Sequence, residues 1–214
     1  GIHLSSYGVD LEQENLLSLI LAVHEVDGIE RIRLGSLEPR IITEEFVRTI
    51  ATLPKICPHF HLSLQSGCDE TLRRMNRRYT AAEYEEKCDL LRMYFKNPAL
   101  TTDVIVGFPG ETEEQFQDTI KLVKEIEFEG AFTFIYSPRE GTPASKIKDS
   151  ITLEEKEKRL HILNEKINNY SLQSNKKFLD KIVKVLVLGI NEKDENKVYG
   201  YTEEMKLVNI EAPF

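Results

Sequence analysis

The stretch TTDVIVGFPGET, residues 101–112, most constrains what this chain can fold into. Residues 102–106 are rich in β-branched side chains, which is typical of a strand buried between packed layers. Gly107 and Gly110 let the backbone turn sharply and approach a ligand closely. The pattern Thr112-Glu-Glu-Gln is a capping box, so a helix is expected to begin there. The stretch therefore predicts a loop at the carboxyl end of a parallel strand, where α/β enzymes keep their sites.

Strand and helix patterns alternate on both sides of this stretch. Further strands are expected at 31–39, 59–67 and 131–136. A first helix is expected at 10–28, with Asp10 as its cap, Gln13 at its third position and Gly28 at its end. Further helices are expected after the cap Thr43, from Thr80 to Pro98, at 112–130 and at 152–177. The alternation predicts an α/β fold, with parallel strands that curve into a full or partial barrel.

The pattern changes after Lys177. Strands are expected at 182–189, 198–202 and 205–210, with a polar turn at 191–197 and no helix between them. Consecutive strands of this kind indicate an antiparallel sheet or barrel. We therefore place a domain boundary near residue 179, which divides the chain into residues 1–178 and 179–214.

Bulk properties narrow the class of protein. The 214 residues suit one large domain, or one domain with part of another. A net charge of −8 argues against non-specific nucleic-acid binding but leaves room for a local basic patch. No signal peptide or membrane-length apolar run is evident, so a cytoplasmic location is expected. We also expect the protein to be a monomer. Because the chain starts at Gly1, at what looks like a strand end, we interpret it as a fragment.

Three cysteines and two histidines are candidate metal ligands. The spacing of Cys57, Cys68 and Cys88 matches neither a zinc site nor an iron–sulfur loop, so structural thiols are expected. His59 and His61 would share one strand face. A metal pair there stays open, although no third ligand is evident.

Polar residues gather at four expected strand ends. These ends meet on one face of a parallel barrel, which favours a site over ordinary structural turns. Such a face suits a zwitterionic, nucleoside-like ligand, with Glu38 for an ammonium group, an arginine for a carboxylate and the backbone near Gly107 for a flat base. The four strand ends carry Ser36 and Glu38, Gln65 and Ser66, residues 107–111, and residues 137–142.

Five motifs in order carry a family resemblance: RIRLGSLEP (31–39), LSLQSG (62–67), MNRRYT (75–80), DVIVGFPGE (103–111) and YSPREGTPA (136–144). Together they resemble the radical S-adenosylmethionine methylthiotransferases. The strings SLEP and GIHLSSYG are most similar to the branch that modifies threonylcarbamoyladenosine (t6A) at position 37 of tRNA. The tail string GYTEEMKLV (200–208) resembles the start of the small RNA-binding β-barrel called the TRAM domain.

The resemblance implies a partial parallel barrel of the radical SAM type. In that family a 4Fe-4S cluster cleaves S-adenosylmethionine to a 5′-deoxyadenosyl radical, and a methylthio group is added to the substrate. Ser36 and Glu38 match positions near the methionine part. The full set of cofactor-binding residues that the resemblance implies is Ser36, Glu38, Gln65, Ser66, Arg77, Val104, Ile105, Gly107, Tyr136 and Arg139.

One departure from the family is decisive. The family holds its cluster with a Cys-x-x-x-Cys-x-x-Cys loop upstream of these motifs, and neither that loop nor the domain before it is present here. We therefore expect that this chain binds no cluster and is inactive alone, and we assign the function to a parent enzyme.

Two basic groups are expected to contact tRNA phosphates. They are Arg73, Arg74 and Arg78 in the centre of the chain and Lys176, Lys177, Lys181 and Lys184 near the boundary. A solvated helix face would give the same pattern. Two other functions stay open: methylthiolation of isopentenyl-adenosine in tRNA or of a ribosomal protein, and a non-catalytic RNA-binding module.

Overall fold

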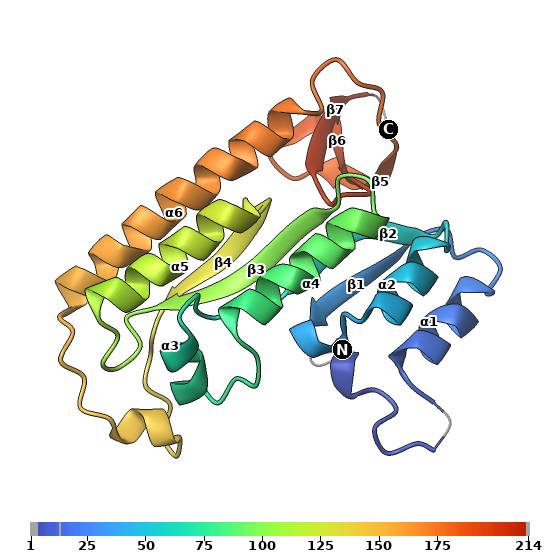
Figure 1. Cartoon of the computed structure of the whole chain (residues 1–214). Coiled ribbons are helices and arrows are strands. Elements are labelled where there is room, and N and C mark those ends of the chain that lie inside the picture. The colour runs from blue at the N-terminus through green and yellow to red at the C-terminus, as the bar shows by residue number, and fades with distance from the viewer. Residues whose placement is uncertain (1–3, 13, 213–214) are drawn as a thin grey trace.

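The computed structural model describes residues 4–12 and 14–212, and its centre is a four-stranded parallel sheet. The strand order is β1-β2-β3-β4, the order of the sequence, as Figure 1 shows. The strands are β1 (Ile32–Leu37), β2 (Ile56–Leu62), β3 (Ala99–Val106) and β4 (Gly130–Ile135). The predicted α/β class with parallel strands is confirmed, and all carboxyl ends meet at one edge of the sheet.

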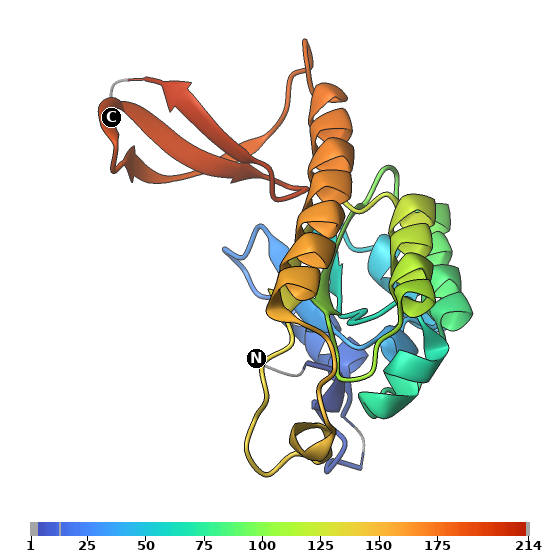
Figure 2. The same cartoon turned by 90° about the vertical axis from the view of Figure 1, so that its left-hand side faces the viewer.

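Helices connect the strands and cover one face of the sheet, whereas the last helix lies along β4 and against α5 (Figures 1 and 2). The helices are α1 (Leu16–His24), α2 (Glu44–Ala51), α3 (Asp69–Arg74), α4 (Ala81–Tyr94), α5 (Glu113–Ile126) and α6 (Leu153–Lys176). Short 3-10 turns lie at η1 (Leu4–Ser6), η2 (Pro39–Ile41) and η3 (Pro143–Lys146). Among the described residues, no helix is long and apolar enough to cross a lipid bilayer.

Alternation along β3 separates the two faces of the sheet. Thr102, Val104 and Val106 are buried beneath the helices, with Val104 at 0% exposure. Asp103 and Ile105 point to the other face, because successive strand residues alternate sides. We call this side, which carries Asp103 and Ile105 of β3 and Phe132 and Phe134 of β4, the open face.

Several predicted caps are confirmed. The side chains of Thr43, Thr80 and Thr112 each accept a hydrogen bond from the backbone three residues later, and Thr80 and Thr112 form reciprocal capping boxes. The predicted end of α5 is wrong, because the left-handed residue that terminates it is Glu127 (φ 53°). Gly130 instead begins β4.

The predicted start of the first helix is also wrong. Asn15 caps α1 by accepting a hydrogen bond from the Ser18 amide at 3.0 Å, and the Ser18 hydroxyl accepts one from the Asn15 amide at 2.9 Å. This local box outcompetes Asp10. The helix ends at His24, so Val26 is 48% exposed. Gln13 and residues 1–3 of the strand end and loop expected at 1–8 lie outside the described residues, and Leu4–Ser6 form a 3-10 turn.

The tail folds as a separate antiparallel sheet, as predicted, in the order β5-β6-β7. Its strands are β5 (Val185–Asn191), β6 (Asp194–Thr202) and β7 (Leu207–Glu211), so the turn expected at 191–197 is much shorter and β5 starts later than residue 182. Arg31 Nη1 donates to the Tyr201 carbonyl at 2.9 Å, and Lys206 pairs with Glu129. The tail thus joins the amino ends of the parallel strands and projects from the body (Figure 2).

Candidate functional site

The glycine turn after β3 has the predicted backbone. Gly107 and Gly110 have φ values of 68° and 78°, which side-chain-bearing residues rarely adopt. A Cβ atom on Gly107 would lie 2.5 Å from Cγ of Lys156, a residue of α6. Gly107 is therefore needed both for its backbone conformation and for the close approach of this lysine.

A buried carboxylate holds the turn closed. Glu111 accepts hydrogen bonds from the Gly107 amide at 2.8 Å and from Arg159 Nη1 at 2.9 Å. Burial raises the pKa of Glu111, while the hydrogen bonds from Gly107 and Arg159 oppose that rise. Arg159 also donates to Glu155 at 3.2 Å on its own helix. Through these contacts α6 fixes the loop at the carboxyl end of the central strand.

Gln65 follows β2 in an unusual conformation. Its φ is 72°, a left-handed value that is costly for a residue with a side chain. Two backbone hydrogen bonds to β3 hold it there, from Gln65 N to the Asp103 carbonyl at 2.7 Å and from Ile105 N to the Gln65 carbonyl at 2.9 Å. Backbone strain of this kind clusters at functional sites, and here it brings the amide side chain to a cavity.

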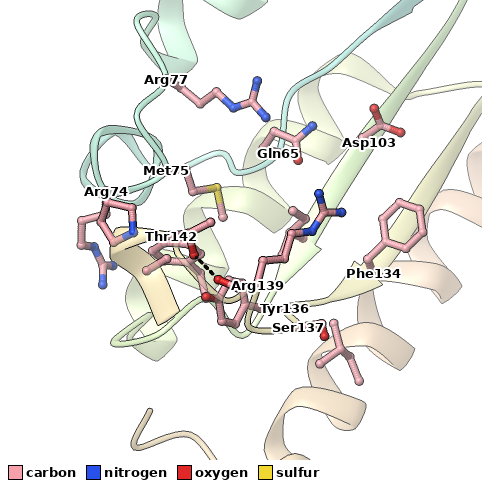
Figure 3. Close-up of a pocket in the computed structure, with 15 residues that line it drawn as sticks. Gln65, Arg74, Met75, Arg77, Asp103, Phe134, Tyr136, Ser137, Arg139 and Thr142 are labelled. Atoms are coloured by element: carbon pink, nitrogen blue, oxygen red, sulfur yellow. Dashed lines mark hydrogen bonds between the residues drawn. The ribbon is translucent and has the colours of Figure 1, made fainter. Parts of the chain in front are cut away.

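That cavity, of about 750 Å³, lies at the carboxyl ends of the strands (Figure 3). We call it the carboxyl-end cavity. In Figure 3, Gln65 and the guanidinium groups of Arg77 and Arg139 lie around one space, with Asp103 beside them. The predicted cofactor residues that line it are Gln65, Arg77, Ile105, Tyr136 and Arg139.

The lining combines charge with a flat apolar wall. Arg77 and Arg139 are exposed guanidinium groups of the lining, and Asp103 is a carboxylate within it. The rings of Phe108 and Tyr136 pack edge to face with centroids 5.0 Å apart. The Tyr136 hydroxyl is buried without a hydrogen-bond partner in the described part of the chain. This set suits a ligand with a carboxylate, hydroxyl groups and an aromatic ring.

The other five predicted cofactor residues do not line the carboxyl-end cavity. Ser36 Oγ lies 3.1 Å from Ser63 Oγ, and Glu38 accepts from Arg40 at 2.6 Å. Ser66 is fully buried and accepts from the Cys68 amide at 3.2 Å. Val104 faces the helices and Gly107 is covered by Lys156. For these five residues, hydrogen bonds and packing contacts that the sequence motifs do not reveal decide where the groups point.

A second cavity, of about 650 Å³, lies further along the open face and shares Asp103 with the first. We call it the mid-sheet cavity, and Arg33, His61 and Phe132 line it together with Asp103. Asp103 Oδ2 lies 3.1 Å from His61 Nε2 and accepts from Ser63 at 3.0 Å. Burial raises the pKa of Asp103, but the contacts with His61 and Ser63 outweigh this and lower it.

The two histidines that could form a metal pair, His59 and His61, both lie on β2. Burial, with the charges of Arg33 and His61, lowers the pKa of His59 to about 4. Within residues 4–12 and 14–212, no group of three or more His, Cys, Asp or Glu side chains could hold a metal ion. The free thiols of Cys57, Cys68 and Cys88 are buried on separate elements, and burial raises the pKa of Cys88 to about 12.

The residues that we expected to contact tRNA phosphates have different surroundings in the structure. Arg74 donates to the Pro109 carbonyl at 2.6 Å and to Gln115 at 2.8 Å, and it lies over the Phe108 ring, so protein groups hold it. Arg73 and Arg78 are exposed. Near the tail, Lys177 and Lys181 line a cavity of about 470 Å³ with Arg92 and Lys96. Lys176 and Lys184 are exposed, and Lys184 lies 4.0 Å from Glu203.

Lys156, Arg159, Phe132 and Phe134 were missed by sequence reasoning. A signal existed for the first two, because Lys156 and Arg159 share the helical spacing of the buried Leu163 and Ile167. For Phe132 and Phe134 the signal was strand alternation, which places both on the side opposite to Thr133. In the structure the Thr133 hydroxyl donates to Asn164 of α6 at 2.6 Å. Their side of β4 therefore faces away from the helix.

Comparisons with known proteins agree with this geometry. The model of the Radical SAM superfamily matches residues 2–123. A tRNA-2-methylthio-N(6)-dimethylallyladenosine synthase from Oceanobacillus iheyensis is 46% identical over 100% of this chain and 41% of its own length. The synthase of that name from Clostridium novyi is 44% identical over 98% of this chain and 46% of its own length. The chain therefore spans about half the length of the curated relatives it matches.

These relatives do not support the expected t6A branch, because their names specify a dimethylallyl (isopentenyl-type) adenosine instead. Short motifs such as SLEP did not discriminate between branches. Among solved structures, coproporphyrinogen III oxidase (HemN) from Escherichia coli, described as a Radical SAM enzyme, aligns with a TM-score of 0.49 and 22% identity, over 70% of this chain and 32% of its own.

Proposed function

The chain belongs to the Radical SAM superfamily, and from this premise we propose that it is the S-adenosylmethionine-binding part of a tRNA methylthiotransferase acting on N6-dimethylallyladenosine. The observation that carries the proposal is 44–46% identity along almost the whole chain to synthases of that product. The composition of the carboxyl-end cavity supports it independently. This substrate was the alternative that the sequence motifs left open.

The carboxyl-end cavity has the groups that S-adenosylmethionine needs. Arg77 would bind the methionine carboxylate, with the positive charge of Arg139 beside it, and the Gln65 amide would hydrogen-bond the ribose hydroxyls. The side chain of Ile105 and the ring of Tyr136 would pack on adenine. When bound, S-adenosylmethionine supplies the methyl group and the precursor of a carbon radical.

The residues of this chain position and shield that ligand. The backbone hydrogen bonds of Gln65 to β3 fix its amide at the rim, which lowers the ordering cost of binding. The buried contact between Glu111 and Arg159 keeps the glycine turn closed beside the cavity. Phe108 and Tyr136 exclude water from one wall.

The residues present do not fit an iron–sulfur cluster. The three thiols are buried on β2, before α3 and on α4, too dispersed to share one cluster. A cluster that serves this cavity would take its ligands from outside residues 1–214.

We also propose a division of labour between the two sheets. Residues 1–178 form part of the radical SAM barrel, and residues 179–214 form the start of a TRAM-like RNA-binding barrel. The support is the change from a parallel to an antiparallel sheet after α6. Lys176, Lys177, Lys181 and Lys184 near this change would contact tRNA phosphates, and exposed Arg73 and Arg78 would add contacts near the cavity.

The experiment that tests the function uses a holoenzyme containing this chain. Transfer RNAs carrying either N6-dimethylallyladenosine or threonylcarbamoyladenosine are incubated with S-adenosylmethionine and a reductant. Nucleoside mass spectrometry should detect the methylthio product only from the dimethylallyl substrate. A product from threonylcarbamoyladenosine alone, or from neither RNA, would overturn the proposal.

A further inference from the structure

The open face carries two large apolar side chains that nothing in the described chain covers. Phe132 and Phe134 of β4 are 63% and 52% exposed. Large apolar side chains gathered in solvent mark binding surfaces more often than chance exposure does. The two rings flank the mid-sheet and carboxyl-end cavities, respectively.

A hydrogen-bonding carboxylate lies next to these rings. Asp103 of β3 is the register partner of Phe132, and Ile105 is the partner of Phe134. The Asp103 side chain is 25% exposed. Its Oδ2 atom is occupied by His61 and Ser63, whereas Oδ1 has no hydrogen-bond partner among residues 4–12 and 14–212. This oxygen is therefore available to a ligand donor beside an aromatic ring.

The surroundings fix the position of this carboxylate. His61 Nδ1 lies 3.0 Å from Thr101 Oγ1, and its Nε2 lies 3.1 Å from Asp103, so the imidazole is held at both nitrogens. The His61 and Phe132 rings lie 5.8 Å apart with an interplanar angle of 56°. The Arg33 side chain at the edge of the same cavity adds a positive charge. An aromatic face, an oriented acceptor and a nearby cation are the groups with which proteins hold an unstacked RNA base and its phosphate.

We propose that Phe132 stacks the target adenine of the RNA substrate and that Asp103 Oδ1 accepts the N–H of its exocyclic amine, which remains when that nitrogen carries one alkyl group. The proposal rests on the proposed function and specifies the residues that take the base. It also explains why the mid-sheet and carboxyl-end cavities share Asp103. A base in the mid-sheet cavity lies next to a cofactor in the carboxyl-end cavity.

The stacking test uses a holoenzyme containing this chain and an RNA hairpin with 2-aminopurine at the unpaired target position. Binding is followed by anisotropy of a dye at the hairpin end, and stacking by quenching of the 2-aminopurine. Phe132→Ala should weaken binding roughly tenfold and abolish the quenching, because one base–aromatic stack is lost. Phe132→Trp should retain both signals, whereas Phe132→Leu should lose the quenching although it stays apolar. Met93→Ala, at a 76% exposed position on α4, is the matched surface control.

The acceptor test compares hairpins with adenine or with purine, which lacks the exocyclic amine, at the target position. Wild-type protein should prefer adenine, and Asp103→Ala, which removes the acceptor, should lose that preference while Phe132→Ala keeps it. A preference that survives in Asp103→Ala overturns the assignment of the acceptor.

Three further outcomes separate this proposal from the proposed function. A wild-type protein that binds no hairpin contradicts the RNA substrate itself. Wild-type binding that Phe132→Ala leaves unchanged overturns only the stacking proposal. A change in sedimentation from dimer to monomer in Phe132→Ala, with unchanged RNA affinity, would show that a second copy covers the open face and would also overturn it.

Discussion

Glu111 of the glycine turn and Arg159 of α6 form a buried ion pair, with 2.9 Å between Oε2 and Nη1 and side-chain exposures of 1% and 6%. The two residues are 48 positions apart in the sequence. The pair connects α6 to the loop beside the carboxyl-end cavity, where Lys156 of the same helix also covers Gly107.

Replacing one residue of the Glu111–Arg159 pair should therefore lower the stability of the protein. Arg159→Met leaves the Glu111 carboxylate buried without its cation, so the free energy of unfolding should fall by about 3–5 kcal/mol. Urea denaturation measures this value. The control Lys158→Met removes a cation that is 68% exposed and should change stability by less than about 0.5 kcal/mol. Equal effects of the two changes would show that the ion pair is not structural.

Substitution of Gly107 by alanine should lower the stability of the fold more than the same substitution at another glycine with a left-handed backbone. Gly107→Ala places a Cβ against Lys156, whereas Gly28 has a similar φ of 82° with no atom within 4 Å of the added Cβ. Gly28→Ala should cost about 1 kcal/mol, as expected for the backbone alone, and Gly107→Ala should cost more. Thermal or urea unfolding of both variants checks the order. The reverse order would contradict the close packing of Lys156 on the turn.

The buried His59 should make stability depend on pH. Its pKa is lowered to about 4 in the folded protein, chiefly by burial, while the unfolded chain binds the proton near pH 6.5. The unfolded state therefore binds more protons between these values, and stability should fall as the pH decreases from about 6.5 to 4, by about 2–3 kcal/mol.

His59→Leu should remove this part of the pH dependence. The exposed His161 of α6 offers the control His161→Gln, which should keep the wild-type slope. Urea unfolding at pH 7 and pH 4.5 gives both values. An unchanged slope in His59→Leu would mean that other groups cause the acid sensitivity.

The lysines between α6 and the tail should give a salt-dependent contribution to RNA affinity. Lys177→Ala and Lys181→Ala should each weaken tRNA binding and lower the slope of log affinity against log salt by up to about one, because each removes one phosphate contact. Lys121→Ala, at a 74% exposed position on α5, should leave the slope unchanged. Filter binding at several salt concentrations measures the slopes. If Lys177→Ala and Lys181→Ala kept the wild-type slope, as Lys121→Ala should, these lysines would be excluded from the RNA interface.

Local signals in the sequence were enough for much of the fold. Capping boxes at Thr80 and Thr112 and the β-branched run before Gly107 predicted their elements correctly. The first helix was misplaced because Asn15, and not Asp10, forms the capping hydrogen bonds with the first turn. Short-range hydrogen bonding therefore explains both the successes and this failure.

The candidate site was predicted less completely, because its geometry depends on contacts between distant segments. Gln65 and Arg77 line the carboxyl-end cavity, whereas Ser36 Oγ lies 3.1 Å from Oγ of Ser63, which is 27 positions away along the chain. Arg159 looked like one of many charges on a polar helix until its partner Glu111 was known. A strand's alternation can predict which face a residue takes, but not which partner it meets there.

The most direct test of the cofactor site is the affinity of S-adenosylmethionine for holoenzyme variants at two neighbouring arginines. Arg77 and Arg78 are both exposed, but only Arg77 is part of the cavity lining. Isothermal titration should show that Arg77→Ala weakens binding roughly tenfold to a hundredfold, as expected for one lost charged hydrogen bond, while Arg78→Ala binds like wild type. Equal affinities of the two variants, or a loss confined to Arg78→Ala, would contradict the assignment of this cavity to S-adenosylmethionine.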